Sequence, residues 1–366
     1  MIPVTILTGF LGSGKTTLLK RILNEKHGMK IAVIENEFGE ENIDNEILVQ
    51  DSQEQIIQMS NGCICCTIRG DLARVLGDLA QQKRDGKLDF DRVVIETTGL
   101  ANPGPVAQTF FMDNEIADEF LLDAIITLVD AKHGNHQLDE HEVVQRQVGF
   151  ADRLFVTKAD LVDAKELHDL RHRLMHMNPR AQIREVNFGE ADVKEVFDLR
   201  GFNLNAKLEI DPDFLAEDEH DHAHTHAHAH DEHGHTHDHD HADCDHDHGQ
   251  CNHEGHDHGH HHHHAHHDDK IKSFVYRSDR PFDPNRLEDF LGGILQIYGE
   301  RLLRYKGVLY MKGVDRKVVF QGVHQMMGSD LAAKWLPIEK KNSKMVFIGI
   351  DLPKDLITDG LDACLV

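Results

Sequence analysis

Residues 9–17 have the types and spacing of a loop that binds phosphate groups. They match the pattern G-x-x-x-x-G-K-[ST] and continue with a second threonine. Glycines let the backbone curl so that its N–H groups point at an anion, and a following helix adds its positive N-terminus. Lys15 would reach the outer phosphates, and Thr16 would offer its hydroxyl to Mg²⁺. The predicted phosphate-binding residues are Gly9, Gly12, Ser13, Gly14, Lys15, Thr16 and Thr17.

Residues 96–99, Glu-Thr-Thr-Gly, form a second motif at the end of a short apolar run. In proteins with a phosphate-binding loop, an acidic residue here holds Mg²⁺ and the glycine responds to the γ-phosphate. Lys15, Thr16 and Glu96 are therefore the predicted catalytic residues, and Thr16 and Glu96 the predicted Mg²⁺ ligands. Gly99 is a predicted nucleotide contact. Leu100 stands where many GTPases carry a water-orienting glutamine, so we expect slow hydrolysis that needs a trigger.

A third motif, residues 157–160, bears on the choice of base. The carboxylate of Asp160 can accept two N–H bonds from guanine, which adenine cannot offer, and the stem of Lys158 can cover the base plane. The tetrapeptide is similar to the N-K-x-D motif for guanine, with Thr157 in place of asparagine. Thr157, Lys158 and Asp160 are therefore predicted to bind the nucleotide, which we expect to be GTP.

A cysteine cluster lies between the first and second motifs, at Cys63, Cys65 and Cys66. Thiolates suit zinc and other borderline-soft ions, and a tetrahedral site needs about four ligands. Glu35 and Glu40 precede the cluster, as does Glu37, and a carboxylate, a histidine or water could complete the site. Clustered cysteines in a cytosolic chain favour metal binding. Buried structural cysteines and a redox pair are the alternatives.

Residues 216–269 differ from the rest of the chain, because they hold 23 of the 31 histidines and 15 acidic residues without lysine or arginine. They contain no large apolar residue, so we predict a disordered segment. Neutral imidazole binds zinc, nickel, copper and cobalt, which favours a metal-binding tract over a plain acidic linker. The eight histidines elsewhere are expected at the surface. Among them, the spacing of His168, His172 and His176 allows an incidental surface metal site.

The bulk composition excludes some classes of partner. A net charge of −25 argues against general nucleic-acid binding. The sequence contains no run of 18 apolar residues, so no membrane span is predicted. The N-terminus shows no secretory signal pattern, so we expect a cytoplasmic protein.

Short apolar runs alternate with amphipathic stretches over the first ~200 residues, which predicts an α/β fold with a doubly wound, mostly parallel sheet. Near-continuous apolar strands are expected where helices cover both faces of a sheet. The predicted strands are residues 3–7, 30–35, 92–96, 124–129 and 153–157, and the predicted helices are 16–24 and 71–82.

A second unit is predicted after the histidine-rich tract. Strands are expected at 273–277, 306–311, 316–321 and 344–351, and helices at 283–297 and 353–364. Asp283 is the expected N-cap of the first of these helices, with Pro284 at its first position. The predicted domains are thus a P-loop NTPase domain at 1–205, a histidine-rich acidic linker at 206–270 and a small α+β domain at 271–366.

The motifs together resemble those of the CobW-like family of metal-handling P-loop GTPases. The matching segments are GFLGSGKTT at 9–17, ENEFGE at 35–40, GCICC at 62–66, ETTG at 96–99 and TKAD at 157–160, with RYKG and FQGV near the C-terminus. The resemblance implies a Mg²⁺-dependent GTPase with an internal zinc site at Cys63, Cys65 and Cys66, completed by Glu35 or Glu40. It also implies metal delivery to a client metalloprotein, with cobalt or nickel as alternative ions.

Four functions follow as hypotheses. The first is a GTP-driven zinc chaperone, in which GTP and metal stabilise one conformation and hydrolysis releases the metal to a client. The second is a metal-storage protein with a regulatory GTPase. A nickel- or cobalt-insertion GTPase and a small-molecule kinase are the others, and the guanine-type motif argues against the kinase. A homodimer is a further hypothesis about the assembly of the chain.

Overall fold

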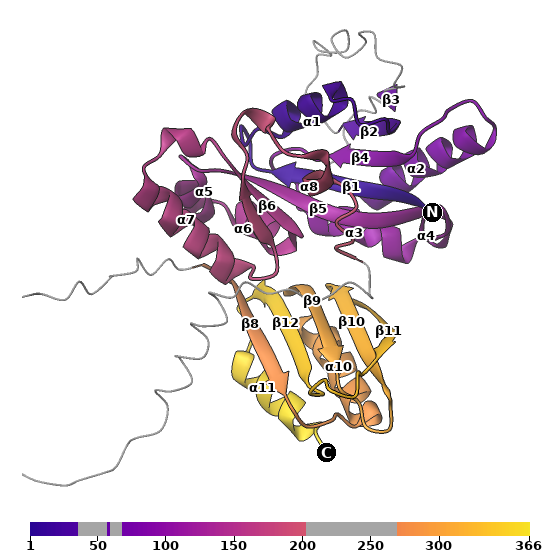
Figure 1. Ribbon diagram of the computed structural model, residues 1–366, viewed down its shortest axis with the longest axis vertical. Helices are drawn as coiled ribbons and strands as arrows, with labels where there is room; N and C mark the ends of the chain where they lie inside the picture. The colour runs from indigo at the N-terminus through magenta and orange to yellow at the C-terminus, as the bar shows by residue number, and fades with distance from the viewer. Residues whose placement is uncertain (36–56, 59–67, 203–268) are drawn as a thin grey trace, which may run out of the picture.

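The computed structural model describes residues 1–35, 57–58, 68–202 and 269–366, which form two sheets with their helices (Figure 1). The predicted metal ligands Cys63, Cys65, Cys66 and Glu40 lie outside these ranges, as does the histidine-rich tract up to residue 268. In the described part of the chain, no helix is long and apolar enough to cross a membrane.

The first sheet has seven strands in the order β3-β2-β4-β1-β5-β6-β7, and all of its strand pairs are parallel. The chain crosses from one side of β1 to the other, which is the doubly wound arrangement predicted from the sequence. The strands are β1 Ile2–Gly9, β2 Ile31–Glu35, β3 Ile57–Gln58, β4 Arg92–Glu96, β5 Phe120–Asp130, β6 Arg153–Thr157 and β7 Gln182–Glu185.

Helices cover both faces of this sheet. Successive residues of a strand point to opposite faces. In β4, Val93 and Ile95 therefore pack on one side, and Val94 packs on the other with Leu18 and Ile22 of α1. The helices are α1 Lys15–Asn24, α2 Ile68–Arg84, α3 Pro103–Met112, α4 Asn114–Glu119, α5 Gly134–Glu140, α6 Glu142–Phe150, α7 Ala164–Met177 and α8 Val193–Val196, with short 3-10 turns η1 Ala159–Leu161 and η2 Asn187–Gly189.

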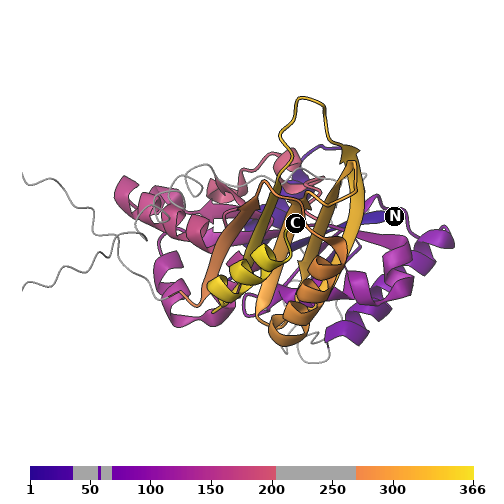
Figure 2. The same ribbon diagram turned by 90° about the horizontal axis from the view of Figure 1, so that it is seen from below.

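The second sheet is antiparallel, with the strand order β11-β10-β9-β12-β8. Two helices lie side by side over one of its faces (Figure 2). The side chain of Asp283 accepts the N–H groups of Asn285 and Arg286, which confirms it as an N-cap. The elements are β8 Ile271–Ser278, α10 Pro284–Tyr298, β9 Leu302–Leu309, β10 Arg316–Val323, β11 Met326–Lys334, β12 Ser343–Ile350 and α11 Lys354–Ala363.

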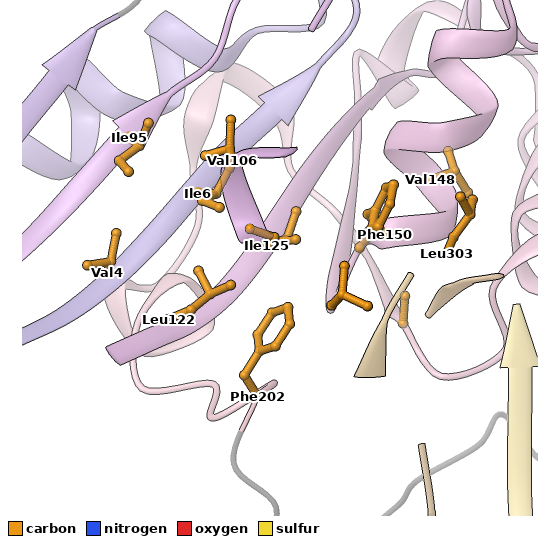
Figure 3. Packing of buried hydrophobic residues seen from close by; sticks show 14 of the residues in the cluster. Val4, Ile6, Ile95, Val106, Leu122, Ile125, Val148, Phe150, Phe202 and Leu303 are labelled. Carbon is orange, nitrogen blue, oxygen red and sulfur yellow. The ribbon is translucent and has the colours of Figure 1, made fainter. Parts of the chain in front are cut away.

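The other face of the antiparallel sheet packs on the first part of the chain through α3, α6 and α7. Figure 3 shows Leu303 of β9 beside Val148 and Phe150 of α6. Gly149 lies between them, and a Cβ atom there would come within 2.8 Å of Leu303 Cδ1. The apolar core therefore continues from one sheet to the other.

One expectation about the histidines is wrong. His324 follows β10 and is only 9% exposed, whereas we expected it at the surface. Its ring meets Phe150 edge-on with centroids 5.3 Å apart, and its Nδ1 lies 3.2 Å from the carbonyl oxygen of Gly299. The junction between the two sheets buries it, and the sequence pattern of a single hairpin does not reveal that junction.

Candidate functional site

The phosphate-binding loop connects β1 to α1 and depends on its glycines. Gly9 has φ 141° and lies against β5, and a Cβ atom there would come within 2.7 Å of Ser13 Oγ. Gly14 has φ 96° and is the N-cap of α1. Both angles are left-handed values that side chains with a Cβ rarely adopt. The helix therefore begins at Lys15, with its first N–H groups directed at the loop.

Lys15 points back into this loop. Its Nζ donates hydrogen bonds to the carbonyl oxygens of Gly9, at 2.8 Å, and Phe10, at 3.2 Å. The residue is 8% exposed, and this burial lowers the pKa of its ammonium group, while the nearby Glu96 carboxylate acts in the opposite direction. The loop therefore holds a buried cation where the outer phosphates of a nucleotide would bind.

Thr16 and Glu96 meet although they are far apart in the sequence. Thr16 Oγ1 donates to Glu96 Oε1 at 2.9 Å. Glu96 ends β4, which is paired directly with β1, so the sheet brings the acidic residue to the start of α1. A hydroxyl and a carboxylate are hard oxygen ligands of the kind that Mg²⁺ prefers. The residues present thus fit the predicted Mg²⁺ site.

The segment after Glu96 lies against the loop. A Cβ atom on Gly99 would come within 2.5 Å of the backbone nitrogen of Leu11, so this approach requires glycine. The buried side chain of Gln147, on α6, donates to the carbonyl oxygens of Gly99 and Ala101, both at 3.0 Å. Sequence reasoning missed Gln147, because no motif surrounds it.

The base end of the site is formed by residues at or just after the carboxyl ends of β5, β6 and β7. Thr157 Oγ1 donates to the carbonyl oxygen of Ser13 at 2.9 Å, so the threonine ties the base motif to the phosphate-binding loop. Lys158 has a left-handed φ of 56°, and its Nζ lies 2.6 Å from Asp130 Oδ2. Asn187 Oδ1 accepts the N–H of Ala159 at 3.0 Å.

Asp160 follows in η1 and is exposed, as a residue that contacts a ligand should be. Asp130 and Asn187 were not predicted. Asp130 could have been found as the acidic residue that ends the apolar run of β5, whereas Asn187 has no local signal.

Of the predicted ligands for a transition metal, the structure describes only Glu35. It ends β2 and is the register partner of Glu96 in the neighbouring strand. The chain after Glu35 continues in sequence toward Cys63, Cys65 and Cys66. Within the described ranges, no group of three or more His, Cys, Asp or Glu side chains is arranged to hold a metal ion.

Two family models match the chain. Residues 3–185 match the nucleotide-binding domain of the CobW/HypB/UreG family, and residues 271–365 match the C-terminal domain of the cobalamin synthesis protein CobW. The chain is also 38% identical, over 360 residues, to the zinc chaperone YjiA of Escherichia coli, covering 97% of this chain and 96% of that protein. The chain belongs to the CobW/HypB/UreG family.

Other members of the CobW/HypB/UreG family agree with this placement. The zinc chaperone CobW of Pseudomonas aeruginosa is 32% identical over 396 residues, which cover 100% of this chain and 92% of the relative. The crystal structure of Zn(II)-bound YjiA GTPase from E. coli superposes with a TM-score of 0.72 at 34% identity, covering 100% of this chain and 99% of that one. The resemblance seen in the motifs and the fold class are thereby confirmed.

Proposed function

We propose that this chain is a Mg²⁺-dependent GTPase that acts as a zinc chaperone and delivers the metal to a client protein in the cytoplasm. The observation that carries the proposal is the position of Glu35 beside Glu96. These residues end neighbouring parallel strands, and neighbouring strands lie about 4.8 Å apart. Glu96 is bonded to Thr16 of the nucleotide site, while Glu35 leads in sequence to the cysteines. The carboxyl ends of β2 and β4 would thus link the nucleotide site to the metal site.

The nucleotide chemistry follows from the residues at this edge. The loop N–H groups and Lys15 would bind the phosphates, and Thr16 and Glu96 would hold Mg²⁺. Mg²⁺, when bound, neutralises charge that develops on the phosphates. Asp160 would accept N–H bonds from guanine, and Lys158 would cover the base. The exposed side chain of Leu100 has no polar group to orient water, which supports slow hydrolysis until a second event adjusts the site.

The metal chemistry rests on the cysteine motif and on the relatives. Cys63, Cys65 and Cys66, with Glu35 or Glu40, would bind zinc as cargo rather than as a permanent cofactor. Relatives are named zinc chaperone in E. coli and P. aeruginosa. A fission-yeast relative, 39% identical over 208 residues and covering 55% of this chain, is named zinc-regulated GTPase metalloprotein activator. GTP and zinc would stabilise the same conformation, and hydrolysis would release the zinc.

The test is GTP hydrolysis by metal-stripped protein in Mg²⁺, with and without one equivalent of zinc, in the parent chain and in Cys65→Ala. We expect zinc to stimulate the parent but not the variant. Cys364→Ala is the matched control, because that buried thiol bonds to backbone carbonyls of Arg286 and Gly360 in the C-terminal part and should not matter. A rate of GTP hydrolysis that changes neither with zinc nor with the Cys65 substitution would contradict the proposed coupling between zinc binding and hydrolysis.

A storage function is the second candidate, favoured by the 23 histidines at 216–269. Deletion of residues 216–268, which keeps Asp269 and its pair with the buried Arg173, separates the two functions. A chaperone should keep its zinc-stimulated GTP hydrolysis after the deletion. A storage protein should lose most of the zinc ions that it binds per chain.

A further inference from the structure

Three histidines form a stripe along α7, outside the nucleotide site. His168, His172 and His176 are spaced four residues apart, so they lie on one side of the helix. The ring centroids of His168 and His172 are 6.4 Å apart, and those of His172 and His176 only 4.4 Å. The Nε2 atoms of His172 and His176 face each other at 3.3 Å.

This separation of the two nitrogens is the one that a shared metal ion requires. Zinc binds imidazole nitrogen at about 2.0–2.1 Å, and two such bonds at a tetrahedral angle place their nitrogens about 3.3 Å apart. Two histidines at i and i+4 on one helix face are also an established way to hold zinc. We propose that His172 and His176 chelate a divalent transition metal of the zinc class through their Nε2 atoms.

The helix that carries the pair is fixed in place around it. The backbone carbonyl oxygen of His176 accepts a hydrogen bond from Ser273 Oγ of β8 at 2.6 Å. The buried Arg173 pairs with Asp269 at 2.5 Å and with Asp139 at 2.7 Å. Both histidines are themselves half-buried. A preorganised pair loses little freedom when it binds an ion, which favours binding.

The position of the pair gives it a role distinct from that of the cysteines. Asp269 directly follows residues 203–268 in the chain, and its partner Arg173 is next to His172 in sequence. The pair therefore lies beside the point where the chain returns from its histidine-rich stretch. Its place on the folded surface, beside this return point and outside the nucleotide site, suits a transit site for such an ion.

Hydrogen exchange of the α7 amides in the full-length chain tests the proposal, with zinc alone as the probe. A metal bridging one helical turn must dissociate before that turn opens. Exchange should therefore slow about tenfold when free zinc is about nine times the Kd of the site. His172→Gln and His176→Gln should each abolish the slowing, while His168→Gln, on the neighbouring turn, should keep it. Exchange without zinc shows whether each variant retains the parent helix.

A crystal of the full-length chain soaked in excess zinc gives the second readout. We expect an anomalous peak about 2.0–2.1 Å from both Nε2 atoms. Equal slowing of exchange in all variants, or none in the parent chain, would overturn the proposal and leave an imidazole–imidazole hydrogen bond. The chain with Cys63, Cys65 and Cys66 all replaced by alanine should behave as the parent does. Loss of slowing there would refute a site independent of the cysteines, whatever the fate of the proposed GTPase function.

Discussion

The two ends of the parallel strands carry charged residues that are used in opposite ways. At the carboxyl ends, Lys15 and Glu96 surround the place where a nucleotide would bind. At the amino ends, Asp152 precedes β6 and accepts hydrogen bonds from Arg304 of β9, at 2.8 Å, and from Arg180, at 3.2 Å. The side chains of these three residues are all almost completely buried.

The difference follows from the direction of the strands. In a parallel sheet the loops and helix N-termini at the carboxyl ends face one crevice, which is where ligands bind. The amino end of β6 is instead covered by Arg304 of the C-terminal sheet and by Phe202, whose ring packs on the guanidinium of Arg304. Charges that are covered in this way must satisfy one another, because a buried unpaired charge is very costly. Similar residue types therefore surround a candidate ligand site at one end and stabilise the fold at the other.

The largest expected effect is at the amino ends. Asp152→Ala would leave Arg304 and Arg180 without their shared carboxylate, and removing one partner of a buried pair costs about 3–5 kcal/mol. Urea denaturation should show this loss, while kcat for GTP in the folded variant stays that of the parent. Asp279→Ala, which breaks an exposed pair with Lys340, should change stability by less than about 0.5 kcal/mol. Equal stabilities for the two variants would contradict a structural role for Asp152.

At the carboxyl ends, Lys15→Ala should act on catalysis instead. Loss of one group that stabilises the transition-state charge typically lowers kcat about 100–1000-fold. A single-turnover assay with GTP and Mg²⁺ measures this, and Lys20→Ala, exposed on the same helix, is the control. If Lys15→Ala lost as much stability as Asp152→Ala while keeping its kcat, the contrast between the two ends would fail.

A smaller effect concerns pH at the junction. Burial lowers the pKa of Lys306 from 10.5 to about 8; Arg180 adds to the shift and Asp152 opposes it. Between these two pKa values the unfolded chain binds more protons than the folded one, so this lysine makes stability rise with pH in that window. Below pH 8 the full free-energy cost of burying the charged Lys306 ammonium group lowers the stability of the folded chain.

Lys306→Met should remove this dependence. Between pH 7 and about 9.5 the parent should gain roughly 1–3 kcal/mol relative to the variant in urea denaturation. Lys312→Met, at an exposed position, should follow the parent. A variant at Lys306 that gains as much as the parent would show that another group titrates.

The strands that could be predicted from the sequence are those with a buried apolar run. Residues 92–96 and 153–157 were predicted with the bounds of β4 and β6. Three edge strands were missed, β3, β7 and β11, and the side chains of β7 and β11 are mostly exposed. Such strands depend on backbone pairing with one neighbour, which leaves little trace in side-chain pattern. The strand expected at 306–311 is β9, which begins at Leu302.

The site was predictable where a motif is local. The phosphate-binding loop, Glu96 and Thr157 are all found at the same sheet edge, as expected from their positions after strands. Gln147 and Asn187 join them only through the packing of α6 and η2, and no local sequence pattern indicates that packing. The domain limits and the metal ligands in residues 59–67 remain predictions.

Gln147 has a mechanical consequence. Its side chain donates hydrogen bonds to the carbonyl oxygens of Gly99 and Ala101. Two residues further along the same helix, Gly149 packs closely against Leu303 of the other sheet. Any displacement of the 99–101 segment toward a γ-phosphate must break two hydrogen bonds, each worth about 1 kcal/mol, or carry α6 with it. In the second case α6 moves as a rigid body, and a displacement at the nucleotide is transmitted through Gly149 to Leu303 of β9.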